Sequence, residues 1–165
     1  MKKIFVILIA VLFCTTSWAQ GSVESAYEHY TRLAKKGDGI AMNRLGILYY
    51  NGNGVQQDYK KAFELYTKAV DMGINSKGGL SEMYYYGYYV TKDYDKAFQL
   101  AKESAEDKTT PSGKGMRILS ACYRYGLGGV SIDNDKAEYW LKEAANHKNE
   151  IAMGLVGAEP GKENR

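Results

Sequence analysis

The sequence predicts an all-α fold in which short helix–turn–helix units stack side by side. Three observations predict it: a pattern of residues that occurs three times, apolar residues at helical spacing inside each copy, and only two prolines in 165 residues. A single helix pair of this size cannot bury its own apolar face, so stacking must supply the core.

The first segment, residues 1–19, has the features of a signal peptide. A basic pair at residues 2–3 precedes an uninterrupted apolar run at 4–13, and Ser17 and Ala19 are the small residues of a cleavage site. The apolar run is too short to span a bilayer comfortably and no second run follows, so the mature chain is expected to lack a membrane span. We therefore expect cleavage after Ala19 and a periplasmic or secreted protein.

Charge content limits the classes of partner that we expect, and the cysteines limit the expected lipidation and disulfides. Without Lys2 and Lys3 the chain keeps 20 basic and 19 acidic residues, too balanced to attract nucleic acid or an anionic membrane. The bulky Phe13 before Cys14 disfavours lipidation, although a lipidated Cys14 stays open as an alternative. Cys122 alone cannot form an internal disulfide and is expected to be a buried, unreactive thiol.

The repeat domain is predicted over residues 20–158, followed by a C-terminal tail at 159–165. It holds half-copies at 24–37 and 150–158, the second of which is cut short by a proline. Between them lie full repeats at about 39–73, 74–107 and 113–147. Their matching positions are Leu45, Tyr49, Gly52, Val55, Asp58 and Ala62 in the first, Leu80, Tyr84, Gly87, Val90, Asp93 and Ala97 in the second, and Leu119, Tyr123, Gly126, Val130, Asp133 and Ala137 in the third.

Each part of the repeat has a physical reason, illustrated by the first copy. Apolar residues of its first helix share one face, and Gly46 on that face lets a neighbouring helix approach closely. Residues 52–54 (Gly-Asn-Gly) tolerate positive φ where the chain reverses. Asp58 is then expected to cap the second helix, whose buried stripe includes the small Ala62 and Ala69.

This pattern resembles the Sel1-like repeat, a relative of the tetratricopeptide repeat. Residues 41–69 match it nearly in full, and the resemblance extends over most of residues 24–157. It implies a short right-handed α-solenoid whose first helices line the concave side. The second repeat departs most from the pattern, because Ser81 replaces a glycine and Tyr88-Tyr89 replace Asn-Gly before the valine.

No set of residues in the sequence forms a catalytic, metal-binding or cofactor motif, so we expect a non-enzyme without cofactor or metal. His29 and His147 lie near opposite ends of the repeat array, and no paired-cysteine or paired-histidine spacing exists. Residues 112–115 (Ser-Gly-Lys-Gly) lack the full order of a phosphate loop and are expected to be a flexible linker. The cysteine-rich branch of the Sel1 family, associated with penicillin binding, has cysteine pairs that this chain lacks.

The resemblance implies that a partner protein binds first-helix residues that are not needed for packing. Tyrosine and arginine gather at these positions in repeats two and three, and both are enriched at binding hot spots. The alternative is that neighbouring helices cover much of the tyrosine run at 84–89. The predicted partner-binding residues are Asn43, Ile47, Tyr50, Glu82, Tyr85, Tyr86, Arg117, Arg124 and Tyr125.

The sequence therefore favours a protein-binding module outside the cytoplasm. Its more specific form is an immunity protein that binds and blocks a secreted antibacterial toxin. This form is implied by the resemblance to exported Sel1-like proteins. The alternatives are an envelope adaptor or a secreted host-interacting factor, and more remotely a small cell-wall or β-lactam hydrolase.

Overall fold

The computed structural model describes residues 24–147, so the predicted signal peptide at 1–19, the half-repeat at 150–158 and the tail at 159–165 lie outside the described residues. Within 24–147 the chain forms seven α-helices and no strand. They are α2 (Ala26–Lys35), α3 (Gly39–Asn51), α4 (Tyr59–Asp71), α5 (Lys77–Tyr86), α6 (Tyr94–Ala105), α7 (Gly113–Tyr125) and α8 (Asn134–Asn146).

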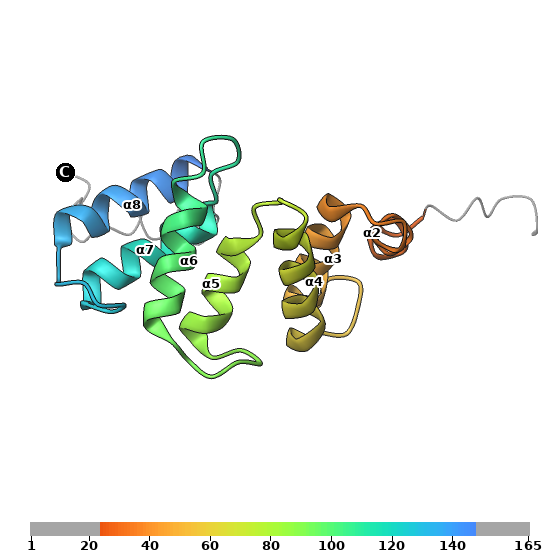
Figure 1. Ribbon diagram of the computed structural model, residues 1–165, viewed down its shortest axis with the longest axis horizontal. Coiled ribbons are helices and arrows are strands. Elements are labelled where there is room, and N and C mark those ends of the chain that lie inside the picture. Colours follow the sequence, from red (N-terminus) through yellow and green to blue (C-terminus); the bar gives the residue numbers. More distant parts are fainter. Residues whose placement is uncertain (1–23, 148–165) are drawn as a thin grey trace, which may run out of the picture.

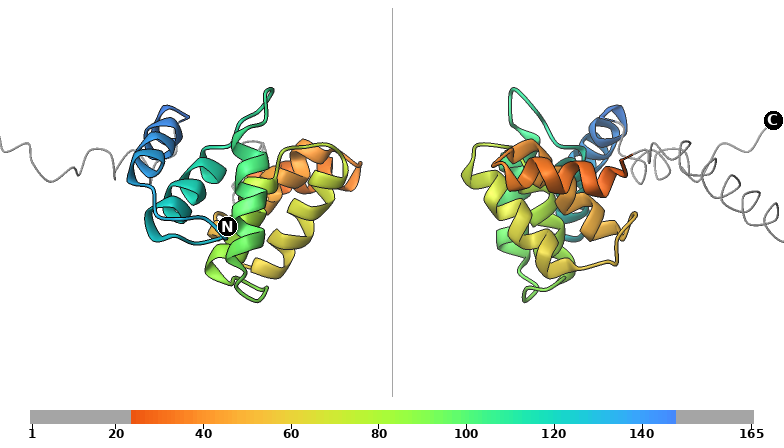
Figure 2. Two further views of the ribbon diagram at one scale, coloured as in Figure 1. Left: turned by 60° about the vertical axis from the view of Figure 1, so that its left-hand side comes forward. Right: turned by 90° about the vertical axis from the view of Figure 1, so that its right-hand side faces the viewer.

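The helices follow one another along the long axis of the molecule in chain order (Figure 1). After α2 they form the pairs α3–α4, α5–α6 and α7–α8, and the helix axes change direction along the row (Figure 2). The predicted all-α solenoid of helix pairs is confirmed. No helix within residues 24–147 is both long and apolar enough to cross a membrane.

Aspartates cap the second helix of each pair, as the repeat pattern predicts. The carboxylates of Asp58, Asp93 and Asp133 accept hydrogen bonds at 2.9–3.0 Å from the backbone N–H three residues further on. The first helix of each pair ends at a glycine with φ between 64° and 76°. These two signals set where each pair turns.

The turn of the second pair contains an unusual residue. Tyr89 has φ 68°, and it is the only non-glycine with positive φ among the described residues. The matching positions in the other pairs are Gly54 and Gly129, with φ 70° and 73°. A non-glycine residue in this left-handed region costs about 1–2 kcal/mol of conformational free energy. The turn of the second pair keeps the same backbone shape although tyrosine stands where the other turns have glycine.

Close contact between repeats one and two depends on two glycines around one tyrosine ring. A Cβ atom on Gly46 would lie 2.9 Å from the ring of Tyr66, and one on Gly79 would lie 2.7 Å from it. Tyr66 is only 1% exposed. The expectation that Gly46 permits close helix approach is confirmed, because the ring fills the space that a Cβ would need.

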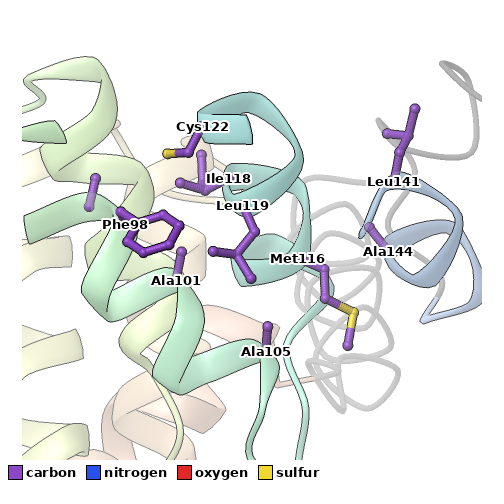
Figure 3. Close-up of a cluster of buried hydrophobic side chains, with 10 residues drawn as sticks. Phe98, Ala101, Ala105, Met116, Ile118, Leu119, Cys122, Leu141 and Ala144 are labelled. Carbon is purple, nitrogen blue, oxygen red and sulfur yellow. The ribbon is translucent and has the colours of Figure 1, made fainter. Parts of the chain in front are cut away.

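The core forms two clusters that follow the order of the repeats. In the first, α3 and α4 pack with Leu80 and Met83 of α5. In the second, Phe98 and Ala101 of α6 face Leu119 of α7, and α8 adds two more buried side chains (Figure 3). The second cluster therefore joins repeats two and three into one buried unit.

The segment before α7 differs from the expected flexible linker, and that prediction is wrong. Ser112 is the N-cap of α7, and its hydroxyl accepts from the N–H of Gly115 at 3.5 Å. Residues 113–115 form the first turn of the helix. Glycine is favoured there by packing, since a Cβ on Gly115 would lie 2.8 Å from the carbonyl oxygen of Ala101.

Candidate protein-binding surface

Side chains from the first helices of all three pairs meet at one place. Glu82 of α5 lies between two cations of α7: its Oε2 accepts from Lys114 Nζ at 2.6 Å, and its Oε1 accepts from Arg117 Nη2. Glu82 and Arg117 are only 3% and 7% exposed. Because two cations share one carboxylate, the group carries an excess of one positive charge.

Tyrosine rings surround these charges. Lys114 Nζ lies 4.4 Å from the ring centroid of Tyr50 on α3, and Arg117 Nη1 donates to the hydroxyl of Tyr86 at 2.9 Å. The ring centroid of Tyr88 lies 6.0 Å from that of Tyr50 and 5.3 Å from that of Tyr86. We call this group the aromatic–basic cluster: Tyr50, Glu82, Tyr86, Tyr88, Lys114 and Arg117.

The hydroxyls of Tyr50, Tyr85 and Tyr88 are neutral at physiological pH. Burial raises the pKa of Tyr50, and the nearby Glu82 carboxylate raises it further. Burial is also the main reason why the pKa of Tyr88 is raised and why that of Tyr85 reaches about 12. A neutral hydroxyl can both donate and accept a hydrogen bond, which suits it to contacts with a polar partner surface.

Four of the nine predicted site residues lie together in the aromatic–basic cluster. Of these, Tyr86 is 40% exposed, Tyr50 is half-buried, and the other two, Glu82 and Arg117, form the buried ion pair beneath them. Glu82 and Arg117 are therefore too buried to face a partner. Their role in the cluster is to position Tyr86 through the Arg117 hydrogen bond.

The other five predicted residues lie outside the cluster. Tyr125 is 63% exposed at the end of α7, beside the exposed Arg124. Tyr85 is half-buried, with its ring centroid 5.4 Å from that of Tyr94. Asn43 and Ile47 are half-buried on α3. Tyr86 and Tyr125, the last residues of α5 and α7, are therefore the accessible aromatic pair.

Lys114 and Tyr88 are members of the cluster that the sequence does not predict. The sequence predicts a linker at Lys114, although its position three residues before Arg117 matches one face of a helix. Tyr88 stacks on Tyr59, with 4.4 Å between ring centroids and 2° between ring planes. No signal in the sequence predicts that stack, since it joins the first residue of α4 to the turn after α5.

The described residues contain one free cysteine, Cys122, which is buried as expected. Burial raises the pKa of its thiol to about 12, so the thiolate is scarce at physiological pH. Within residues 24–147, no group of three or more His, Cys, Asp or Glu side chains is placed to hold a metal ion.

The Sel1 repeat family matches at residues 21–38, 39–74, 78–108 and 113–149, which together make up most of the chain. An uncharacterized Sel1-like repeat-containing protein of Schizosaccharomyces pombe is 38% identical over 69 residues, covering 39% of this chain and 10% of that protein.

Two solved structures have a similar fold. A Sel1 repeat protein from Oxalobacter formigenes has a TM-score of 0.65 and 29% identity, and the match covers 84% of this chain and 56% of that one. A protective antigen of uropathogenic Escherichia coli with an SLR fold has a TM-score of 0.60 and 30% identity, covering 78% of this chain and 27% of that one. This chain thus spans 56% or less of each similar protein.

Proposed function

Because the chain belongs to the Sel1 repeat family, we propose that it is an exported, non-catalytic module that binds another protein. The helix pairs present an extended surface, which is how stacked helical repeats bind their partners. Export rests on the signal-peptide features of residues 1–19.

The observation that carries the proposal is the pair of exposed tyrosines Tyr86 and Tyr125. They occupy the same position at the ends of α5 and α7, and they are 40% and 63% exposed. A tyrosine supplies a large contact area and a polar hydroxyl at little conformational cost, and such residues dominate binding energies at interfaces. The buried Glu82–Arg117 pair holds Tyr86 through the Arg117 Nη1 hydrogen bond, so part of the surface is pre-organised.

The more specific form of the proposal is an immunity protein that covers the active site or substrate entrance of a secreted antibacterial toxin. It rests on the resemblance to exported Sel1-like proteins. The alternative of a secreted host-interacting factor has support in one similar protein, the protective antigen of uropathogenic Escherichia coli.

The test is affinity capture from native periplasm with the wild-type chain and with a Tyr86→Ala, Tyr125→Ala variant. Tyr139→Ala is the matched control, because Tyr139 is 56% exposed and lies on α8, a second helix of its pair. We expect one partner that the wild type and the control retain and the double variant loses. If loss of the Tyr86 hydroxyl weakens folding, the single variant Tyr125→Ala still tests the surface, because it leaves Tyr86 unchanged.

Capture of the same partners by the double variant would show that the working surface lies elsewhere. The immunity role requires further that the captured partner is a toxin and that an equimolar amount of this chain inhibits it. Turnover of a peptidoglycan or β-lactam substrate by the purified chain would refute the non-catalytic proposal.

A further inference from the structure

The turn between α5 and α6 contains a surface hollow with a volume of about 630 Å³. It is shallow and open to solvent, so it suits an exposed segment of a partner rather than an enclosed small molecule. Two aromatic residues, Tyr84 and Tyr89, and two basic residues, Lys92 and Lys96, line it. The rest of the lining is Val90, Thr91 and Asp93.

The lysines of this hollow differ from their counterparts in the other turns. In repeats one and three the matching lysines pair with the capping aspartates: Lys61 Nζ lies 3.4 Å from Asp58 Oδ2, and Lys136 Nζ lies 2.9 Å from Asp133 Oδ2. Among the residues that the structure describes, Lys96 has no such ion pair, and its Nζ lies 4.4 Å from the ring centroid of Tyr84.

Lys92 adds a second unbalanced charge. Its counterparts in repeats one and three are Gln57 and Ile132, so this cation belongs to repeat two alone. Lys92 Nζ lies 5.7 Å from the ring centroid of Tyr94, and it too has no ion pair with a carboxylate of residues 24–147. Two of the lining residues are therefore lysines that form no ion pair with a carboxylate of residues 24–147.

Tyr89 is the third feature that only repeat two possesses. Its backbone has the left-handed φ of 68° that glycine adopts in the other two turns, yet its side chain is 53% exposed. Its ring centroid lies 5.7 Å from that of Phe63, so only part of the ring is used in packing between repeats. Tyr89 is thus an exposed aromatic residue, held at a strained φ, in the lining of the hollow, and this supports the hypothesis of a binding site.

We propose that this hollow binds an acidic segment of a partner protein, with a carboxylate paired to Lys92 and Lys96 and a neighbouring apolar side chain against Tyr89. Charge complementarity selects a carboxylate, since the unpaired lysines exceed the single capping aspartate in the lining. The exposed Tyr89 ring and Val90 select a peptide that carries an apolar residue next to its acid. The inference rests on the proposed function only in taking the ligand to be a protein, and the site is separate from Tyr86 and Tyr125.

The experiment is an NMR titration of the ¹⁵N-labelled protein with the capped tripeptide Glu-Phe-Glu, compared with the neutral tripeptide Gln-Phe-Gln. We expect saturable shifts of the amide signals of residues 89–96 with the acidic peptide and about tenfold weaker binding of the neutral one. Lys96→Gln should weaken binding of the acidic peptide about tenfold. The matched control Lys136→Gln removes the same charge from the same position of repeat three and should leave binding unchanged.

Tyr89→Gly is a second test in which the turn keeps its backbone conformation, because glycine adopts this φ in the other two turns. We expect the same loss of peptide binding as with Lys96→Gln. The variant Tyr86→Ala, Tyr125→Ala should bind the tripeptide like the wild type. Loss of partner capture in that variant therefore reports on the proposed function, whereas loss of tripeptide binding in Lys96→Gln reports on this hollow.

Three results would overturn the inference. One is equal binding of the acidic and neutral peptides, and another is equal weakening by Lys96→Gln and Lys136→Gln. The third is the absence of saturable shifts at up to about 10 mM acidic peptide. A glucuronate titration distinguishes the source of the carboxylate: glucuronate binding without tripeptide binding would refute a peptide ligand.

Discussion

Glu82 and Arg117 face each other across the boundary between repeats two and three, with little access to water. A buried charge is tolerated only when it is paired, because removal of one partner leaves the other desolvated and uncompensated. Arg117 also donates to Tyr86, so this ion pair connects the packing of two repeats to an exposed tyrosine of the proposed surface.

Glu82→Ala should lower the free energy of unfolding by about 3–5 kcal/mol, because Arg117 would remain buried without its carboxylate. Urea unfolding measures the change. Glu103→Ala is the control: Glu103 pairs with Lys77 at 2.6 Å but is 55% exposed, and exposed pairs contribute less than about 1 kcal/mol. Equal effects of the two substitutions would mean that Glu82 is not held as a buried partner.

Tyr66→Phe should leave the free energy of unfolding unchanged or raise it by about 1 kcal/mol. Within the described residues the Tyr66 hydroxyl is buried without a hydrogen-bond partner, so its removal ends a desolvation cost. Tyr49→Phe is the matched control, because the hydroxyls of Tyr49 and Tyr27 share a hydrogen bond at 3.1 Å. The control should lose about 0.5–1.5 kcal/mol. If Tyr66→Phe lowers the free energy of unfolding more than Tyr49→Phe does, an ordered water must hydrogen-bond to the Tyr66 hydroxyl.

At the scale of elements, the three turns share one backbone arrangement and differ in the side chains that they carry. A positive-φ glycine ends each first helix, and an aspartate caps each second helix. With the backbone held by these two ends, the residues between them are free to vary. Repeat two has Tyr89 and Lys92 at positions where the other turns carry small or uncharged residues.

The loop between α6 and α7 is held by Asp107. Its Oδ1 accepts from the backbone N–H groups of Thr109 and Thr110 at 2.9 and 2.8 Å, and from the Thr109 hydroxyl at 2.7 Å. The N–H of Thr110 is the largest contribution that lowers the pKa of Asp107 from 3.8 to about 2. The loop therefore keeps its anchor in moderately acidic solution.

This lowered pKa predicts a pH dependence of stability. Since the folded-state pKa lies below the ordinary value, the stabilising effect is complete above pH 3.8 and is lost as pH falls towards about 2. Asp107→Asn should have a lower urea midpoint than the wild type at neutral pH, and the difference should shrink as the wild type becomes protonated. A difference that stays constant down to about pH 2 would contradict the proposed role of the carboxylate.

At the scale of the whole molecule, stability is expected to rise from α2 towards α7. α2 contains no fully buried residue, whereas α7 contains seven. In a solenoid each unit contacts only its neighbours, so local opening should begin where burial is least.

Hydrogen exchange should therefore be fastest in α2 and slowest in α7. Leu119→Ala removes a side chain that is 1% exposed in the cluster of α6, α7 and α8. It should reduce protection in those helices more than in α3 and α4. Mass spectrometry of exchanged peptides measures both patterns, and an equal loss of protection along the whole chain would show that the stack unfolds as a single unit.

Much of the fold could be predicted because local signals repeat. Asp58, Asp93 and Asp133 cap their helices as expected, and Gly46 lies against a ring from the next helix. The site was predicted only in part. Spacing placed Tyr50 and Tyr86 among binding residues, but it could not distinguish them from Glu82 and Arg117, which lie at similar register and are buried.

By itself the sequence determined the helix pairs, their order and the residues that end them, because caps and positive-φ turns act between neighbours in the chain. Only the tertiary structure decided which of the tyrosines and charges remain accessible. That choice depends on how repeats far apart in sequence pack together, as when Lys114 of α7 meets Glu82 of α5 and Tyr50 of α3. Burial and pairing are properties of the stack, and no single repeat contains the information that sets them.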